Sequence, residues 1–205
     1  DLLPLEYRLP VASAQVKSAI LLAGLHAPGA TTVIEPAPSR DHTERLLAGF
    51  GASVEVTATA DGGRRITLQG QPELVGRTLV VPADPSSAAF PLVAALIVPD
   101  SRVVLPGIGI NPLRVGLIET LVAMGGRIAI ENRRVESGEP VADLIVETSP
   151  LTAIDVPAAR VPAMIDEFPI LAAAAACARG TTRMQGLAEL RVKESDRLDA
   201  IARGL

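Results

Sequence analysis

The pattern of hydrophobic and polar positions recurs along the chain. Three stretches, residues 19–33, 90–104 and 170–184, each combine an apolar helical run, a turn and a β-branched strand. In the first two copies an amphipathic helix that ends in glycine follows, at RDHTERLLAGFG and NPLRVGLIETLVAMGG. Two stretches that alternate polar and apolar residues, with turn residues between them, then predict a β-hairpin.

A short strand is predicted to enter each copy, over residues 5–10, 77–81 and 153–156. The repeating unit is therefore strand, helix, strand, helix, strand, strand. The third copy stops where its second helix should end, before the two closing strands. We expect the chain to be a piece of a longer protein, and a shortened terminal repeat is the alternative.

The first helix of each copy is apolar on nearly every face, which is typical of a buried helix. The strands alternate, so that one face of each sheet meets water. This combination predicts an inside-out α/β (α+β) fold of βαβαββ repeats, with helices inside and sheets outside. A break is expected at VVPAD, which divides the chain into domains over residues 1–83 and 84–205.

The composition narrows the classes of function. The chain has 205 residues, 48% of them hydrophobic and 2% aromatic, and a net charge of −4, which argues against nucleic-acid partners. The longest apolar stretch, residues 168–178, contains Pro169 and is too short to span a membrane. The single cysteine, Cys177, lies in this apolar run and fits a reducing, cytoplasmic setting.

The starts of the apolar helices are candidate anion sites. Aligning the repeats places Gln15 with Ser86 and Asp166, each at the start of one such helix. Helix N-termini present unpaired N–H groups and the positive end of the helix dipole. The alternative is ordinary N-capping, by Ser13, by Ser86 or Ser87, and by Asp166.

Lysine is rare in this chain. Lys17 and Lys193 are the two lysines among nineteen basic residues, so each is a position where an ammonium group is specifically wanted. On a helix that begins at Ser13, Lys17 lies one turn in, among apolar neighbours. It either extends to solvent or reaches a charged ligand, and the sequence leaves both open.

The segment RVKESDRL concentrates charge. On a helix, Lys193 and Arg197 would share a face and repel each other. An anion bound between them would attract both side chains and so offset this repulsion. Glu194 lies beside Lys193 and offers a carboxylate for acid–base chemistry. The alternative is a solvated helix start, in which Glu194 and Asp196 complement the helix dipole.

Asp166 is the second candidate for proton transfer. Its neighbours Ile165 and Phe168 are apolar, so its carboxylate is expected to be partly desolvated, which suits a general acid or base. N-capping of the following helix is the competing interpretation.

Four segments, SAQVKSA, RDHTE, MIDEFPILAAAAA and LRVKESDRL, resemble the 5-enolpyruvylshikimate-3-phosphate synthases, in order and over the whole chain. SAQVK and RDHTE resemble the class II branch, whereas NPLR departs from it, because class II members have threonine where Leu113 stands. The resemblance implies the enolpyruvyl transferase fold of two lobes, each with three βαβαββ units. Residues 1–83 would be the last unit of the lobe that binds shikimate phosphate, and residues 84–205 nearly two units of the other lobe.

The family transfers the enolpyruvyl group of phosphoenolpyruvate to the 5-hydroxyl of shikimate 3-phosphate and releases phosphate. The resemblance implies a cytoplasmic monomer that needs no metal or organic cofactor. Asp166, Glu194 and Lys193 match the catalytic positions, with Lys193 also a substrate ligand. The implied substrate-binding residues are Ser13, Ala14, Gln15 and Arg40 for shikimate phosphate, Asp166 for the substrate hydroxyls and Arg197 for phosphoenolpyruvate. About half of the site would lie in this chain, which is therefore expected to be inactive alone.

Two other functions stay open on the sequence. The related UDP-N-acetylglucosamine enolpyruvyl transferases share the fold, but they often use a reactive loop cysteine, whereas Cys177 is expected in a buried helix. A non-catalytic scaffold built from the repeat would explain the packing. It would not explain why residues suited to anions recur at three helix starts.

Overall fold

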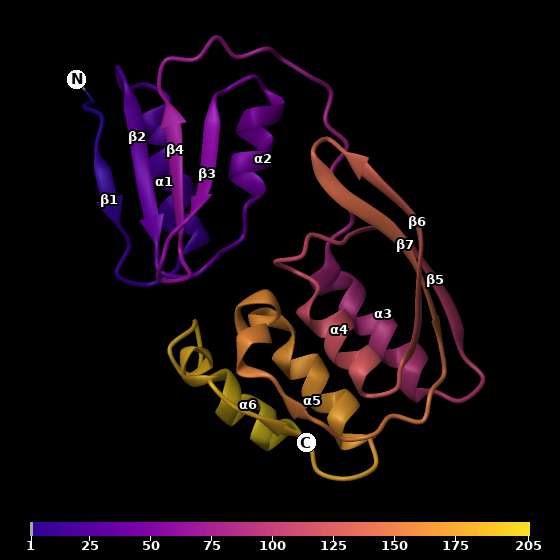
Figure 1. Cartoon of the computed structure of the whole chain (residues 1–205). Helices are drawn as coiled ribbons and strands as arrows, with labels where there is room; N and C mark the ends of the chain where they lie inside the picture. The colour runs from indigo at the N-terminus through magenta and orange to yellow at the C-terminus, as the bar shows by residue number, and fades with distance from the viewer. Residues whose placement is uncertain (1) are drawn as a thin grey trace. The chain divides into compact units, whose positions relative to one another are not determined.

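Residues 2–205, which the computed structural model describes, fall into two units (Figure 1). The first consists of the chain up to Val81 together with Glu136–Glu139, and the second of Pro82–Val135 and Pro140–Leu205. Their assignment to the two lobes of a larger fold stays a prediction.

The first unit has the element order that the repeat predicts. Its four strands form one sheet in the order β1-β2-β4-β3, in which β1 runs parallel to β2 and the other neighbours are antiparallel. Figure 1 shows α1 and α2 against this sheet. The elements are β1 (Glu6–Arg8), α1 (Ala14–Gly24), β2 (Ala30–Glu35), α2 (His42–Gly49), β3 (Val54–Ala58) and β4 (Arg64–Gln69).

Alternation along the strands builds the core of the first unit. Val33, Ile66 and Leu68 point to the helical side of the sheet and are fully buried together with Leu21 of α1. Strand β3 lies at the edge of the sheet, and four of its five residues are exposed. The period-two pattern of the sequence therefore decides which face of the sheet the helices cover.

The start of α1 confirms one capping prediction. Ser13 has extended backbone dihedrals, and its hydroxyl accepts a hydrogen bond of 3.3 Å from the amide of Val16. The expectation that α1 is buried on nearly every side is wrong for the described chain. Only a stripe of α1 is buried, at Lys17, Leu21 and Gly24.

The second unit holds the other two copies. Strands β5, β7 and β6 form one sheet in that order, and β8 and β9 pair in parallel. Its helices and strands are α3 (Pro85–Ile97), β5 (Arg102–Gly109), α4 (Gly116–Ala123), β6 (Arg127–Glu136), β7 (Glu139–Glu147), β8 (Asp155–Val156), α5 (Phe168–Ala176), β9 (Arg183–Met184) and α6 (Arg197–Gly204). Three short 3₁₀ helices connect them: η1 (Ala158–Ala163), η2 (Ile165–Glu167) and η3 (Ala188–Arg191).

The core of the second unit lies between its helices and the β5-β7-β6 sheet (Figure 1). Six residues of α3 are buried, so this helix matches the prediction that α1 does not. Leu96, Leu121, Leu144 and Leu171, which come from α3, α4, β7 and α5, are completely inaccessible to solvent. Burial of leucines from four elements joins the second and third copies into one core.

The strand predicted over residues 77–81 is not formed. In its place Ala83 makes a single parallel bridge to Ile108 of β5. Val80 and Val81 are 55% and 84% exposed, and Pro82 has no N–H group to donate to a neighbouring strand. The bridge at Ala83 therefore occupies the place that β1 holds in the first unit.

A bulge interrupts β5 shortly before its end. The register against β7 shifts between Leu105 and Ile108, and Gly107 has a φ of 67°, which favours glycine. The Gly107 amide donates a hydrogen bond of 2.8 Å to Asp143 of β7. The bulge thus sets the direction in which the chain leaves the strand.

The expected caps of α3 and α5 are wrong. Asp84, not Ser86 or Ser87, caps α3 and accepts hydrogen bonds of 3.2 Å and 2.8 Å from their amides. The reason is Pro85, whose fixed φ suits the first helical position and makes the preceding residue the cap. Asp166 lies in η2, one residue before the N-cap position of α5, which Glu167 occupies.

Asp84 makes the stability of the second unit depend on pH. Burial raises the pKa of Asp84, but hydrogen bonds from the Ser87 hydroxyl and from the amides of Ser87 and Ser86 outweigh it and leave the pKa lowered. Because the folded-state pKa is lowered, this stabilisation is full above about pH 4, the unfolded value, and declines as the pH falls through the folded-state pKa.

We expect Asp84→Ala to lower the free energy of unfolding by about 1 kcal/mol at pH 7, as for other N-cap losses. The difference between variant and wild type should shrink as the pH falls below about 4. Urea unfolding at a series of pH values measures both. A difference that stays constant down to pH 2 would show that the ionised Asp84 carboxylate does not stabilise α3.

Candidate functional site

The sequence-predicted site residues of the first and third copies follow the carboxyl ends of the parallel strands. Parallel pairs β1–β2, Ala83–Ile108 and β8–β9 begin the three copies. The carboxyl ends of parallel strands meet at one edge, so the first helix start and the segment after the second strand both follow that edge. The predicted residues fall in these segments: Ser13, Ala14, Gln15 and Arg40 in the first copy, and Asp166, Lys193, Glu194 and Arg197 in the third.

In the first unit the four predicted substrate-binding residues occupy two short segments. Ser13 and Ala14 are half-buried and Gln15 is exposed in the first turn of α1. Arg40 is half-buried in the loop between β2 and α2. The N–H groups of the α1 start and a guanidinium group are both suited to an anionic substrate.

Lys17 neither extends to solvent nor points to a ligand site, the two possibilities that the sequence left open. Its side chain is completely buried, and its ammonium nitrogen lies 2.7 Å from Glu44 Oε1 and 3.3 Å from Glu35 Oε2. These carboxylates come from α2 and from the end of β2, so they were not recognisable as partners from the sequence around Lys17. Lys17 is therefore an internal ion-pair residue and not a direct ligand.

In the second unit the structure brings Asp166, Glu194 and Arg197 together. The Arg197 guanidinium donates one hydrogen bond of 3.1 Å to Asp166 Oδ1 and two of 3.0 Å to the Glu194 carboxylate. Glu194's own backbone amide and the Arg197 side chain lower the pKa of Glu194. Burial would lower the pKa of Arg197, but its bonds to Glu194 and Asp166 outweigh burial and raise it.

Lys193 does not share a helix face with Arg197, so that expectation is wrong. Helix α6 begins only at Arg197, because Asp196 is its N-cap and accepts a hydrogen bond of 3.0 Å from the Asp199 amide. This confirms the alternative interpretation for Asp196. Lys193 lies in the bend before the helix, where its ammonium group pairs with Glu189.

Arg114 is a central residue that the sequence analysis missed. Its side chain is 9% exposed, and its guanidinium lies 2.6 Å from Ser86 Oγ and 3.4 Å from Asp84. It also lies 3.6 Å from Glu167 Oε1 and 3.9 Å from Asp166 Oδ2. The one signal was NPLR, an arginine two residues beyond a proline, which the sequence analysis used only to place the subclass.

The Asp166 carboxylate is held between two arginines. Its Oδ1 faces Arg197 and its Oδ2 faces Arg114, while its side chain remains 34% exposed. A carboxylate in this setting can accept hydrogen bonds from hydroxyl groups, and the adjacent guanidinium groups can bind anionic parts of the same ligand. This is the strongest chemical constellation in the second unit.

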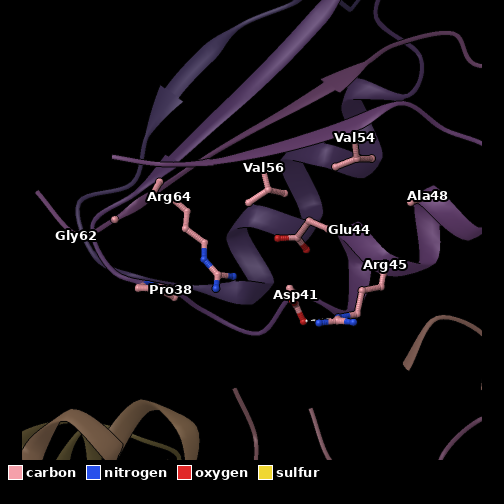
Figure 2. A pocket seen from close by; sticks show the side chains of 11 residues that line it. Pro38, Asp41, Glu44, Arg45, Ala48, Val54, Val56, Gly62 and Arg64 are labelled. Atoms are coloured by element: carbon pink, nitrogen blue, oxygen red, sulfur yellow. Dashed lines mark hydrogen bonds and ion pairs between the residues drawn. The ribbon is translucent and has the colours of Figure 1, made fainter. Parts of the chain in front are cut away.

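A hollow of about 550 Å³ lies in the first unit, outside the predicted site (Figure 2). It is bounded by α2 and the β3–β4 hairpin, and an ion pair of 2.9 Å joins Asp41 to Arg45 at its rim. Glu44, which contacts Lys17, forms part of its wall. None of the sequence-predicted site residues lines this hollow, so it adds nothing to that site.

Two other kinds of feature are absent from residues 2–205. No group of three or more histidine, cysteine, aspartate or glutamate side chains in this range is arranged to hold a metal ion. No helix in the same range has the length and apolar character that crossing a bilayer requires.

A comparison with known protein families narrows the interpretations to one family. The model of EPSP synthase, 3-phosphoshikimate 1-carboxyvinyltransferase, matches residues 2–205. The chain belongs to the EPSP synthase family. This match favours EPSP synthase over the related enolpyruvyl transferase that uses UDP-N-acetylglucosamine. The premise about Cys177 was wrong, since this residue is exposed just beyond the end of α5.

Individual EPSP synthases match the chain along its whole length. The 3-phosphoshikimate 1-carboxyvinyltransferase of Rhodospirillum rubrum is 66% identical over 203 residues, which is 99% of this chain and 45% of that protein. The enzyme of the same name from Methylorubrum populi is 65% identical and covers 100% of this chain. The chain spans less than half the length of these curated relatives.

A solved structure of EPSP synthase from Acinetobacter baumannii superimposes with a TM-score of 0.90 and 52% sequence identity, over 100% of this chain and 45% of that one. This agreement confirms the inside-out α/β fold that the repeat predicted.

Arg114 should stabilise the second unit through Glu167 in particular. Glu167 is 3% exposed, and its Oε2 atom has no hydrogen-bond partner within the described residues. We expect Arg114→Met to cost about 3 kcal/mol in urea unfolding, because it leaves a buried carboxylate without its cation.

A double-mutant cycle isolates this pair. Arg114→Met combined with Glu167→Gln should cost at least about 1 kcal/mol less than the two single changes added together. Arg102→Met is the control, since Arg102 pairs with Glu147 at the surface and its loss should cost under about 0.5 kcal/mol. Strict additivity in the cycle would contradict the assigned coupling.

Proposed function

We propose that this chain supplies about half of the active site of an EPSP synthase. The enzyme would transfer the enolpyruvyl group of phosphoenolpyruvate to the 5-hydroxyl of shikimate 3-phosphate. The observation that carries the proposal is the Asp166 carboxylate between Arg197 and Arg114, in a chain that matches this family throughout. The enzyme is proposed to act as a cytoplasmic monomer without a metal or organic cofactor.

The reaction needs anion binding and two proton transfers. In the addition step the 5-hydroxyl oxygen bonds to C2 of phosphoenolpyruvate, the hydroxyl proton leaves and the methylene carbon gains a proton. In the elimination step the bond from C2 to the phosphate oxygen breaks and phosphate leaves with its electron pair, while the methyl group loses a proton and its C–H electrons form the C2–C3 double bond of the product. Both substrates are polyanions, so positioned cations and helix N-termini stabilise their binding and the charge that develops.

The residues of the second unit are suited to the reacting centre. Asp166 would accept the hydrogen bond of the attacking hydroxyl, because each of its oxygens is already oriented by an arginine. Arg197 would bind phosphoenolpyruvate, with Lys193 as a further cationic ligand. When the substrate takes the N–H groups of Arg197, Glu194 would lose the two hydrogen bonds that Arg197 donates to it, and its carboxylate would become available to carry a proton.

The residues of the first unit are suited to shikimate 3-phosphate. Ser13, Ala14 and Gln15 form the first turn of α1, where backbone N–H groups favour an anion. Arg40 would contact the phosphate group with a guanidinium fork.

We expect the 205-residue chain to release no phosphate from phosphoenolpyruvate and shikimate 3-phosphate, because its relatives use more than twice this length of chain. A polypeptide that contains this chain and is as long as the related enzymes should release phosphate only when both substrates are present. Turnover by the 205 residues at a comparable rate would show that the site is complete in them. A folded full-length protein without turnover would favour a scaffold.

In that full-length enzyme we expect Asp166→Ala to lower kcat about 10²-fold to 10⁴-fold while KM for either substrate changes far less. The matched control is Asp199→Ala, which removes an exposed carboxylate of α6 that pairs with Arg203. Steady-state kinetics with both substrates measure the two variants. An unchanged kcat for Asp166→Ala would remove this residue from the mechanism.

A further inference from the structure

A buried cluster of three charges crosses the first unit. Lys17 of α1, Glu35 at the end of β2 and Glu44 of α2 expose 0%, 0% and 7% of their side chains. Two carboxylates thus share one ammonium group, and Glu44 Oε2 has no hydrogen-bond partner within the described residues. Buried ion pairs in proteins often add no net stability over apolar side chains of the same volume, so stability alone does not explain the cluster.

Glu35 and Lys17 together make three hydrogen bonds to Ser39. The Ser39 amide donates to Glu35 Oε1 at 3.2 Å, and its hydroxyl donates to Glu35 Oε2 at 2.5 Å. The Lys17 ammonium donates to the Ser39 carbonyl oxygen at 3.4 Å. Every polar group of Ser39 therefore bonds to this ion pair, which apolar residues could not achieve.

Ser39 is the residue before Arg40, so the carbonyl that Lys17 holds belongs to the peptide group that carries the Arg40 nitrogen. We propose that Lys17 and Glu35 are positioning residues that fix Arg40 through Ser39 and so set the affinity for the phosphate group of shikimate 3-phosphate. The proposal rests on the proposed function, in which Arg40 contacts that phosphate. Lys17 also ties this loop to α1, whose first turn carries Ser13 and Gln15.

The cluster contains its own matched control. Glu44 binds the same ammonium as Glu35 but makes no hydrogen bond to Ser39 among the described residues. A second link between α1 and α2, the 2.7 Å hydrogen bond between the hydroxyls of Ser18 and Thr43, likewise bypasses Ser39. Loss of either contact tests helix packing without releasing the Arg40 loop.

The experiment uses the full-length enzyme and measures kcat, KM for each substrate and thermal unfolding. Glu35→Ala and Ser39→Ala should raise KM for shikimate 3-phosphate about tenfold and about threefold, with KM for phosphoenolpyruvate and kcat within about twofold. Glu35→Gln should recover part of the loss, because its carbonyl oxygen still accepts from Ser39. Glu44→Gln and Ser18→Ala should leave both KM values within about twofold.

The decisive test compares Ser39→Ala in the wild-type enzyme with Ser39→Ala in an enzyme that also carries Arg40→Ala. If Ser39 acts through Arg40, Ser39→Ala should change KM for shikimate 3-phosphate by less than about 1.5-fold once Arg40 is removed. The same effect in both backgrounds would overturn the proposal, as would equal KM increases in Glu35→Ala and Glu44→Gln. Ser39→Ala removes one part-buried hydroxyl hydrogen bond and leaves the Lys17–Glu35 ion pair in place, so the test stays valid even if Glu35→Ala fails to fold. A wild-type enzyme that does not use shikimate 3-phosphate would instead defeat the proposed function.

Discussion

Parallel pairing at the start of each repeat is the constraint on which the other features depend. Once β1 lies parallel to β2, the chain must leave both strands at the same edge, and α1 must cross back over the sheet to connect them. The bridge between Ala83 and Ile108 and the pair β8–β9 impose the same geometry on the other copies. A few backbone hydrogen bonds therefore decide where distant side chains can meet.

A basic residue then links the two segments at that edge in every copy. Lys17 links α1 with the end of β2, Arg114 links the segment after β5 with Asp84, and Arg197 links the start of α6 with Asp166. The first link is fully buried, whereas the third reaches solvent. Buried charges add little net stability, but they hold the backbone in one arrangement because each hydrogen-bond donor requires a specific acceptor.

The sequence predicts the local features of this chain well. The order of elements follows from hydrophobic periodicity, and the Ser13 cap follows from residue type, because both depend on neighbours along the chain. The Asp84 cap could also have been predicted, because a proline at the first helical position, here Pro85, indicates that the residue before it is the N-cap. The prediction instead named Ser86 or Ser87. The strand expected over residues 77–81 did not form, because Pro82 has no N–H group to donate and the pairing with β5 is limited to a bridge at Ala83.

The site was predictable only in part. The segments around Asp166 and Arg197 carry enough charge to be noticed, but the contact of Arg114 with Asp166 joins parts of the chain that only folding brings together. The partners of Lys17 were hidden for the same reason. A buried ion pair leaves no periodic trace in the sequence, because each partner looks like a polar residue in an otherwise ordinary helix or strand.

The narrow buried stripe of α1 has a consequence for handling the protein. Val16 and Leu22 are 45% and 48% exposed, and Leu2, Leu3 and Leu5 are also accessible beside an apolar groove of about 470 Å³. An apolar surface of this kind attracts other apolar surfaces in water. Self-association through this surface should therefore limit the concentration at which the 205-residue chain stays in solution.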